Sequence, residues 1–144
     1  MRVVIQRSKN SSVSVDKKVV GKINYGLVVL VGFTEGETLK DIDYIINKII
    51  NVRIFDGDPE KSVIDVGGEI LAISQFTLYA NAKKGRRPSY IEALANAEAK
   101  EMYNLFVERL KATDVKVETG IFGADMEVNI VNDGPFTIII DSKE

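Results

Sequence analysis

The 144-residue chain contains no cysteine and no histidine. Without cysteine it can form no disulfide and offers no thiolate nucleophile. The usual zinc sites and a Ser-His-Asp triad also need one of these two residue types, so they are excluded too. Any catalysis must use hydroxyls, carboxylates, lysine, tyrosine, backbone groups or a group that the substrate supplies. We expect no cofactor and no metal, although carboxylates could still hold a hard cation.

Long apolar runs are missing as well. The longest, residues 27–31, is far too short to cross a membrane, and no charged region followed by an apolar one marks a secretory signal. No linker, internal repeat or low-complexity tract divides the sequence. With 45% hydrophobic and 28% charged residues, the composition predicts one globular domain over residues 1–144, located in the cytoplasm and without a membrane partner.

Positive charge is slightly outnumbered by negative charge, and one dense cluster of it stands out. The net charge of −2 and the pI of about 5.3 argue against broad electrostatic affinity for nucleic acid. One short run is the exception, with four cations within five positions: Lys83, Lys84, Arg86 and Arg87. Such a run is usually a solvated loop. Contact with phosphates is the alternative interpretation.

The first half of the chain has the pattern of strands followed by a helix. Val- and Ile-rich segments at 2–7, 12–16, 18–23 and 26–33 predict short strands in an antiparallel arrangement. From residue 39 to residue 50 the apolar positions recur every three or four residues, which predicts an amphipathic helix. Thr38 and Asp41 have the spacing of a capping box at its start. Residues 56–59 have the composition of a loop.

The second half predicts a further helix and several strands. Gly67-Gly68 suits a tight hairpin turn between residues 63–66 and 69–74. A second helix is expected over 91–111, with Ser89 as N-cap and Glu92 three residues later. Three more strands are expected near 115–119, 126–131 and 136–140, the last two joined by a turn at 132–134. This order of elements predicts an α/β fold with a mixed sheet.

Two short segments resemble the signature motifs of the D-aminoacyl-tRNA deacylase family: Ser-Gln-Phe-Thr-Leu-Tyr at 74–79 and Asn-Asp-Gly-Pro-Phe-Thr at 132–137. Other segments similar to family sequence follow the same order along nearly the whole chain, at 1–7, 65–69, 84–89 and 123–126. The resemblance implies a three-layer α/β/β fold with largely antiparallel sheets and two main helices, in a homodimer. It also implies hydrolysis of the ester bond at the 3′ end of D-aminoacyl-tRNA.

The resemblance places Gly134 and Pro135 in the active site. In this family the Gly-Pro bond is cis, and the dipeptide of one subunit enters the active site of the other. Its two backbone carbonyls would face the substrate's α-carbon, so that an L side chain collides while a D side chain points to solvent. This arrangement predicts little selectivity among D-amino acids and acceptance of glycyl-tRNA mischarged on tRNA-Ala. Arg7 is expected beside the dipeptide as a brace.

By the same resemblance, Ser74, Gln75, Phe76 and Thr77 form the other half of the pocket. Thr77 is the obvious nucleophile, but a neutral hydroxyl needs an adjacent base, and the motif contains no lysine or carboxylate. The alternative uses the 2′-hydroxyl of the terminal adenosine with water as the attacking group. Backbone N–H groups of residues 75–77 would then stabilise the oxyanion. We assign Thr77 a positioning role and keep the covalent route as the second hypothesis.

The remaining candidate residues surround this pocket. Phe122 and Met126 match family positions that line the adenosine pocket, where a ring can stack on a base; without the resemblance both would be assigned to the core. Next to such a site, Lys84, Arg86 and Arg87 are predicted to contact tRNA phosphates.

Some features leave room for other interpretations. Phe136 stands where the family has a smaller β-branched residue, and we expect it to face the core. Two other classes of function stay open. One is a non-catalytic nucleic-acid-binding module, and the other is a dimerising structural domain in which the turn at Gly134-Pro135 is only a subunit contact.

Overall fold

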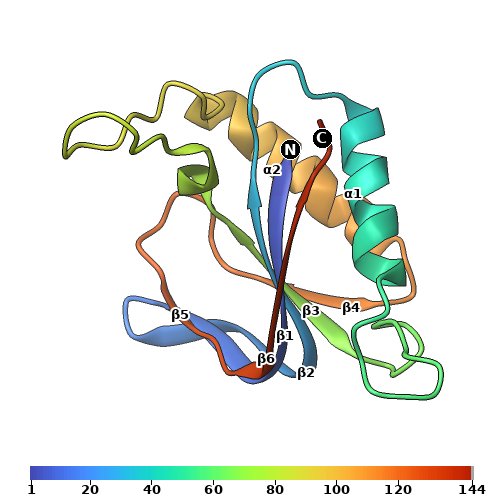
Figure 1. The fold of residues 1–144 in the computed structure, drawn as a ribbon. Coiled ribbons are helices and arrows are strands. Elements are labelled where there is room, and N and C mark those ends of the chain that lie inside the picture. Colours follow the sequence, from blue (N-terminus) through green and yellow to red (C-terminus); the bar gives the residue numbers. More distant parts are fainter. Residues whose placement is uncertain (144) are drawn as a thin grey trace.

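Two long strands form an antiparallel hairpin at the centre of the fold (Figure 1): β1 (Arg2–Val15) and β2 (Lys18–Gly32). The computed structural model describes residues 1–143. The antiparallel arrangement is confirmed, but the division into four short strands is wrong. Ser8 and Ser11, which lie between the first two predicted strands, stay paired: Ser8 is opposite Gly26 and Ser11 is opposite Ile23.

The sheet is mixed, as predicted. β3 (Glu69–Ser74) pairs parallel with β2, and β4 (Lys116–Thr119) pairs parallel with β3. On the other side, β5 (Glu127–Asn129) and β6 (Asn132–Asp141) both pair antiparallel with β1. They follow one another along the same edge of β1, so residues 132–134 are not the turn that we predicted between two strands.

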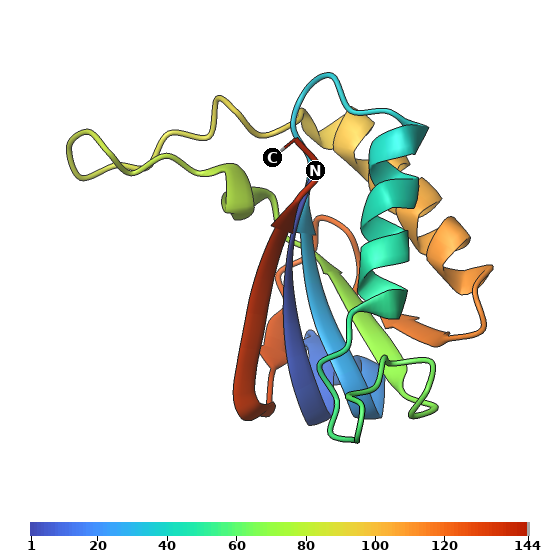
Figure 2. The same ribbon diagram turned by 45° about the vertical axis from the view of Figure 1, so that its right-hand side comes forward.

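Two helices, α1 (Leu39–Asn51) and α2 (Asn96–Lys111), cover one face of the sheet (Figure 2). The predicted capping box at the start of α1 is confirmed: Thr38 Oγ1 accepts a hydrogen bond from the Lys40 N–H, and Asp41 Oδ2 accepts one from the Thr38 N–H. The apolar side of α1 is buried against the sheet. Within residues 1–143, neither helix is long and apolar enough to cross a membrane.

α2 begins five residues later than predicted. Ser89, the expected N-cap, instead exchanges two backbone hydrogen bonds of 2.8 Å with Asn81. A turn follows, in which the Ala93 N–H donates to the Tyr90 carbonyl, and the Leu94 N–H then donates to Phe33. These tertiary bonds hold residues 89–94 in a non-helical path, so the local capping signal is overridden.

The predicted hairpin at Gly67-Gly68 is also wrong. Residues 63–66 form a turn rather than a strand, with the Val66 N–H donating to the Ser62 carbonyl at 3.2 Å. Gly67 follows at a φ of +64°, which suits glycine. β3 then enters the sheet parallel to β2, because the helix α1 has carried the chain back to the opposite end of the sheet.

A second core lies on the face away from the helices. The far half of the β1–β2 hairpin curls over this face, and its buried side chains pack against β3; the buried members are Val13, Ile23, Val28, Leu71 and Ile73. The curled part of β2 also lies close to β4, since a Cβ added at Gly21 would be 2.5 Å from the Thr119 carbonyl oxygen. Helices, sheet and curled hairpin make the α/β/β layering that the resemblance implied.

Candidate active site

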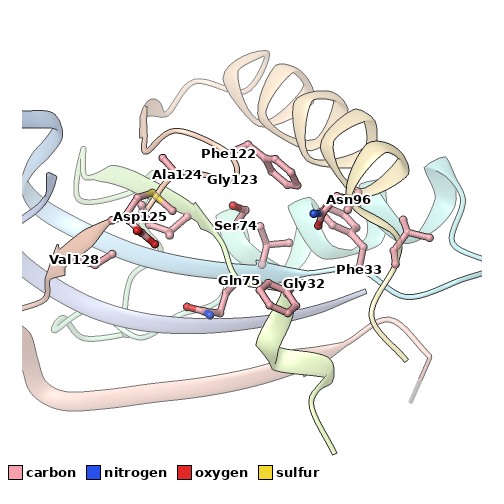
Figure 3. A pocket seen from close by; sticks show the side chains of 16 residues that line it. Gly32, Phe33, Ser74, Gln75, Asn96, Phe122, Gly123, Ala124, Asp125 and Val128 are labelled. Carbon is pink, nitrogen blue, oxygen red and sulfur yellow. The ribbon is translucent and has the colours of Figure 1, made fainter. Parts of the chain in front are cut away.

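A cavity of about 350 Å³ opens where β3 ends, between the start of α2 and the segment 122–128. Figure 3 shows Ser74 and Gln75 on one side of it and Phe122 on the other. Phe76 and Met126 complete the set of predicted residues in its lining. The fold therefore brings five of the twelve predicted site residues together at one cavity, although they come from two distant parts of the sequence.

The first signature motif leaves the sheet at this cavity. The Gln75 N–H donates to the Val31 carbonyl at 2.7 Å, and the chain then enters the short 3₁₀ helix η1 (Phe76–Tyr79). In the described part of the chain, the N–H groups of Phe76 and Thr77 donate to no acceptor. Of the three N–H groups predicted as oxyanion donors, that of Gln75 is therefore already used and the other two are available.

Thr77 lies outside the cavity lining. Its side chain is exposed, and its Oγ1 accepts a hydrogen bond of 2.5 Å from the side-chain amide of Gln75. Within residues 1–143, no lysine or carboxylate bonds to this hydroxyl. Among the described residues the Thr77 hydroxyl therefore has no base beside it, and it accepts its hydrogen bond from Gln75.

Phe122 and Met126 form a partly buried wall of the cavity. The Phe122 ring packs 5.7 Å from that of Tyr103, whose hydroxyl donates to the Ala72 carbonyl at 2.8 Å. Burial raises the pKa of Tyr103 well above its usual range, so this hydroxyl stays a neutral donor. Gly120 gives Met126 its space, since a Cβ there would lie 2.4 Å from the Met126 sulfur.

The second signature motif bulges out of the edge strand. Ser8 pairs with Asn132 and Gln6 with Thr137, so four residues of β6, 133–136, lie opposite Arg7 alone. The Gly134-Pro135 bond is cis. Both residues are exposed and neither lines the cavity of their own chain. Figures 1 and 2 place the start of β6 at the end of the sheet opposite η1.

Arg7 holds this bulge in place. It is only 8% exposed, and its Nη1 donates to the Ile54 carbonyl at 2.7 Å. Its Nε donates to the Asp133 carbonyl at 3.2 Å and faces the carboxylate of the same residue. Arg7 therefore lies beside the dipeptide, as predicted. Phe136 does not face the core: the bulge lifts it out of the strand, and its ring lies 5.4 Å from the Arg7 guanidinium.

The basic residues lie on an arm formed by residues 80–93, which projects from the body of the protein (Figure 2). The backbone pairing of Asn81 with Ser89 closes its base. Lys84, Arg86 and Arg87 are all exposed, and none forms an ion pair within the described residues. The structure places them beyond the cavity rather than in it.

Two polar residues of the cavity were missed by the sequence analysis. Asn96 stands in the first turn of α2, and the misplaced start of that helix concealed it. Among the described residues that line the cavity, only Asp125 is ionisable. It belongs to segment 123–126, which resembles the family, so this segment was the signal that could have pointed to it.

The fold and this site define a family. The sequence model of the protein family described as D-Tyr-tRNA(Tyr) deacylase matches residues 4–141, so the chain belongs to that family. Over 147 aligned positions it is 58% identical to the D-aminoacyl-tRNA deacylase of Aquifex aeolicus (strain VF5) and 54% identical to that of Clostridium acetobutylicum. Each alignment covers 100% of this chain and 99% of the relative.

Solved structures are similar as well. The chain matches the c-Myc DNA Unwinding Element Binding Protein with a TM-score of 0.92 at 37% identity, covering 98% of each chain. A probable eukaryotic D-amino acid tRNA deacylase matches with a TM-score of 0.78 at 18% identity, over 96% of this chain and 97% of that one. The second likeness concerns the fold alone.

Proposed function

We propose that the cavity at the end of β3 hydrolyses the ester bond of D-aminoacyl-tRNA and releases free amino acid and tRNA. Membership of the family makes the chain a hydrolase of the deacylase class. The observation that carries the assignment to this cavity is its lining, where Ser74, Gln75 and Phe76 of the first motif face Phe122 and Met126 across one hollow.

The substrate supplies the reactive hydroxyl in the proposed mechanism. The 2′-hydroxyl of the terminal adenosine, next to the ester, orients a water molecule and assists its attack on the carbonyl carbon. The bond to the 3′-oxygen then breaks, and that oxygen takes the proton. The unpaired N–H groups of Phe76 and Thr77 support this route, because donors of this kind stabilise a developing oxyanion. The bond between Gln75 and Thr77 supports a positioning role for the threonine.

Chiral rejection is assigned to a second copy of the chain in a homodimer. Gly134 and Pro135 are exposed on a bulge and lie away from their own cavity, which is the arrangement needed for insertion into a neighbour's. β6 is an edge strand with an open flank, and Ile139 on it is 66% exposed. Carbonyls in the cavity would exclude an L side chain and leave glycine unopposed, so glycyl-tRNA on tRNA-Ala would also be a substrate.

Binding of the phosphates near the 3′ end of the tRNA is assigned to the arm. The cations Lys84, Arg86 and Arg87 are free to neutralise phosphates of the 3′ end. A non-catalytic RNA-binding module is the rival function favoured by the same cations. A cytoplasmic location, where such a substrate is found, stays a prediction from the sequence.

Release of amino acid from matched D-tyrosyl-, L-tyrosyl- and glycyl-tRNA, with a chelator present, tests the proposal. We expect rapid release from the D and glycyl substrates and at least about a hundredfold slower release from the L substrate, the discrimination that roughly 2.7 kcal/mol supplies. Binding without release would favour the RNA-binding module. If the protein neither binds nor hydrolyses these tRNAs, the remaining hypothesis is the dimerising structural domain.

Replacing Pro135 by alanine tests the chiral filter. Proline fixes its own φ, so alanine frees the bulge and loosens the two carbonyls. We expect release from L-tyrosyl-tRNA to rise roughly tenfold, equivalent to about 1.4 kcal/mol of lost rejection. The matched control is Pro59→Ala in the exposed loop at 56–59. Unchanged discrimination in the Pro135 variant would place the filter elsewhere.

A further inference from the structure

Two aromatic rings lie exposed at the mouth of the cavity. Phe76 is 52% exposed and Tyr90 is 45% exposed, and their ring centroids lie 5.3 Å apart with the planes inclined at 62°. Ile91, the next residue on the arm, is 91% exposed. Single exposed apolar side chains are ordinary, whereas a contiguous group of them beside a cavity marks a binding surface.

Backbone bonds hold Tyr90 in this position. Ser89, directly before it, is paired with Asn81 through two hydrogen bonds of 2.8 Å. The Tyr90 carbonyl accepts from the Ala93 N–H at 3.0 Å, and the buried Leu94 then anchors the arm to the body. The ring therefore stands on a fixed segment, which lowers the entropy lost when a ligand packs against it.

The order of features along this surface matches the end of a single RNA strand. Phe76 belongs to the cavity lining, and its ring also packs against that of Tyr90. Beyond Tyr90 the arm carries its unpaired cations at residues 83–87. Cavity, rings and cations thus follow one another as ester-bearing sugar, unstacked base and phosphates do at an RNA 3′ end. An apolar peptide would offer no negative charge to pair with the cations on the arm.

We infer that Phe76 and Tyr90 form a stacking platform for the unpaired base that precedes the aminoacylated adenosine. Tyr90 is then a specificity-determining residue: it lets the enzyme prefer an RNA end over a single aminoacylated nucleoside. Aromatic rings suit this task because every base has a π-face, so the platform accepts any tRNA. The inference deepens the proposed function and rests on it.

Substrates of increasing length test the platform. D-tyrosyl-adenosine fills only the cavity, D-tyrosyl-CpA adds the base assigned to the platform, and D-tyrosyl-tRNA adds the remaining phosphates. For Tyr90→Ala we expect kcat/KM to fall roughly 5- to 100-fold on the dinucleotide and the tRNA, the range of one stacking contact. Activity on D-tyrosyl-adenosine should stay at the wild-type value. Tyr90→Phe keeps the ring and should restore activity on all three substrates.

A fluorescent probe reports stacking without turnover. Deacylated CpCpA in which 2-aminopurine replaces the penultimate base should be quenched by the wild-type protein and by Tyr90→Phe, and not by Tyr90→Ala. Tyr44→Ala is the matched control, since Tyr44 is 43% exposed but lies on α1. This readout separates the two proposals, because quenching without any hydrolysis would sustain the platform while the proposed activity fails.

Three outcomes would overturn the inference. An equal loss on D-tyrosyl-adenosine and on the longer substrates would mean that Tyr90 only supports Phe76. Unchanged activity on every substrate would mean that no base rests there. A change in oligomeric state on sedimentation, seen with Tyr90→Ala and not with Tyr44→Ala, would make the aromatic pair a contact between subunits.

Discussion

A D-aminoacyl-tRNA that ends in 2′-deoxyadenosine is expected to be hydrolysed at least about a hundredfold more slowly than the natural substrate, because a positioned proton-transfer group contributes roughly 10²- to 10⁴-fold. Thr77→Ala, by contrast, should keep kcat within about tenfold of the wild-type value, since the variant loses only a hydrogen bond that orients Gln75. Single-turnover release of labelled D-tyrosine measures both effects on the chemical step.

The pair of results distinguishes two mechanisms. If Thr77 were the nucleophile, its alanine variant would be inactive and the deoxy substrate would still acylate the enzyme. An acyl-enzyme trapped by rapid acid quench would then be visible by mass spectrometry. The structure argues against that outcome, because no base contacts the Thr77 hydroxyl in the described residues. Thr34→Ala is a suitable control, since Thr34 also makes one short side-chain hydrogen bond but lies outside the cavity lining.

Gly26→Ala is expected to destabilise the fold by at least about 3 kcal/mol, near the upper end of the cost of overpacking. A Cβ on Gly26 would lie 1.8 Å from the Glu69 carbonyl oxygen and 2.6 Å from its nitrogen. Both atoms belong to the backbone of β3, so no side chain can move aside. The midpoint of urea unfolding measures the loss of stability. Activity should fall as well, because β3 carries Ser74 to the cavity.

The matched control is Gly36→Ala. Gly36 has a φ of +83°, and a Cβ there would meet no atom within 4 Å. This variant therefore carries the backbone cost alone, about 1–2 kcal/mol for a left-handed conformation. Equal destabilisation by the two substitutions would show that contact with Glu69 is unimportant. A much larger loss at Gly26 would attribute the effect to the close approach of β2 and β3.

Local signals predicted the elements whose residues bond to close neighbours. The capping box at Thr38 depends on bonds within three residues, and it was predicted correctly. The end of β3 at Ser74 was also predicted correctly, although the bonds that hold it run to β2. The start of α2 was wrong because Ser89 bonds to Asn81 across the arm. The Ser89 hydroxyl still accepts a hydrogen bond of 3.4 Å from the Ile91 N–H, but the tertiary pairing keeps the following residues from continuing as a helix.

The candidate site, too, could be predicted only in part from the sequence. The composition alone excludes thiol and imidazole side chains from the site, since this depends only on which residues exist. The gathering of Phe122 with Ser74 came from family resemblance, because the two segments are far apart in sequence and only the sheet brings them together. The bulge at 133–136 was missed entirely: a turn and a bulge use the same Asn-Asp-Gly-Pro chemistry, and only pairing with β1 distinguishes them.

The bulge on β6 also has a genetic consequence. In the proposed dimer the dipeptide of each chain enters the cavity of its neighbour, so every working site contains residues from two polypeptide chains. A mutation in the dipeptide would harm the neighbour's site, while a mutation in the cavity would harm the chain's own. Two such defective alleles in one cell would assemble some mixed pairs in which one site is doubly damaged and the other is fully intact. Each allele would thereby complement the other.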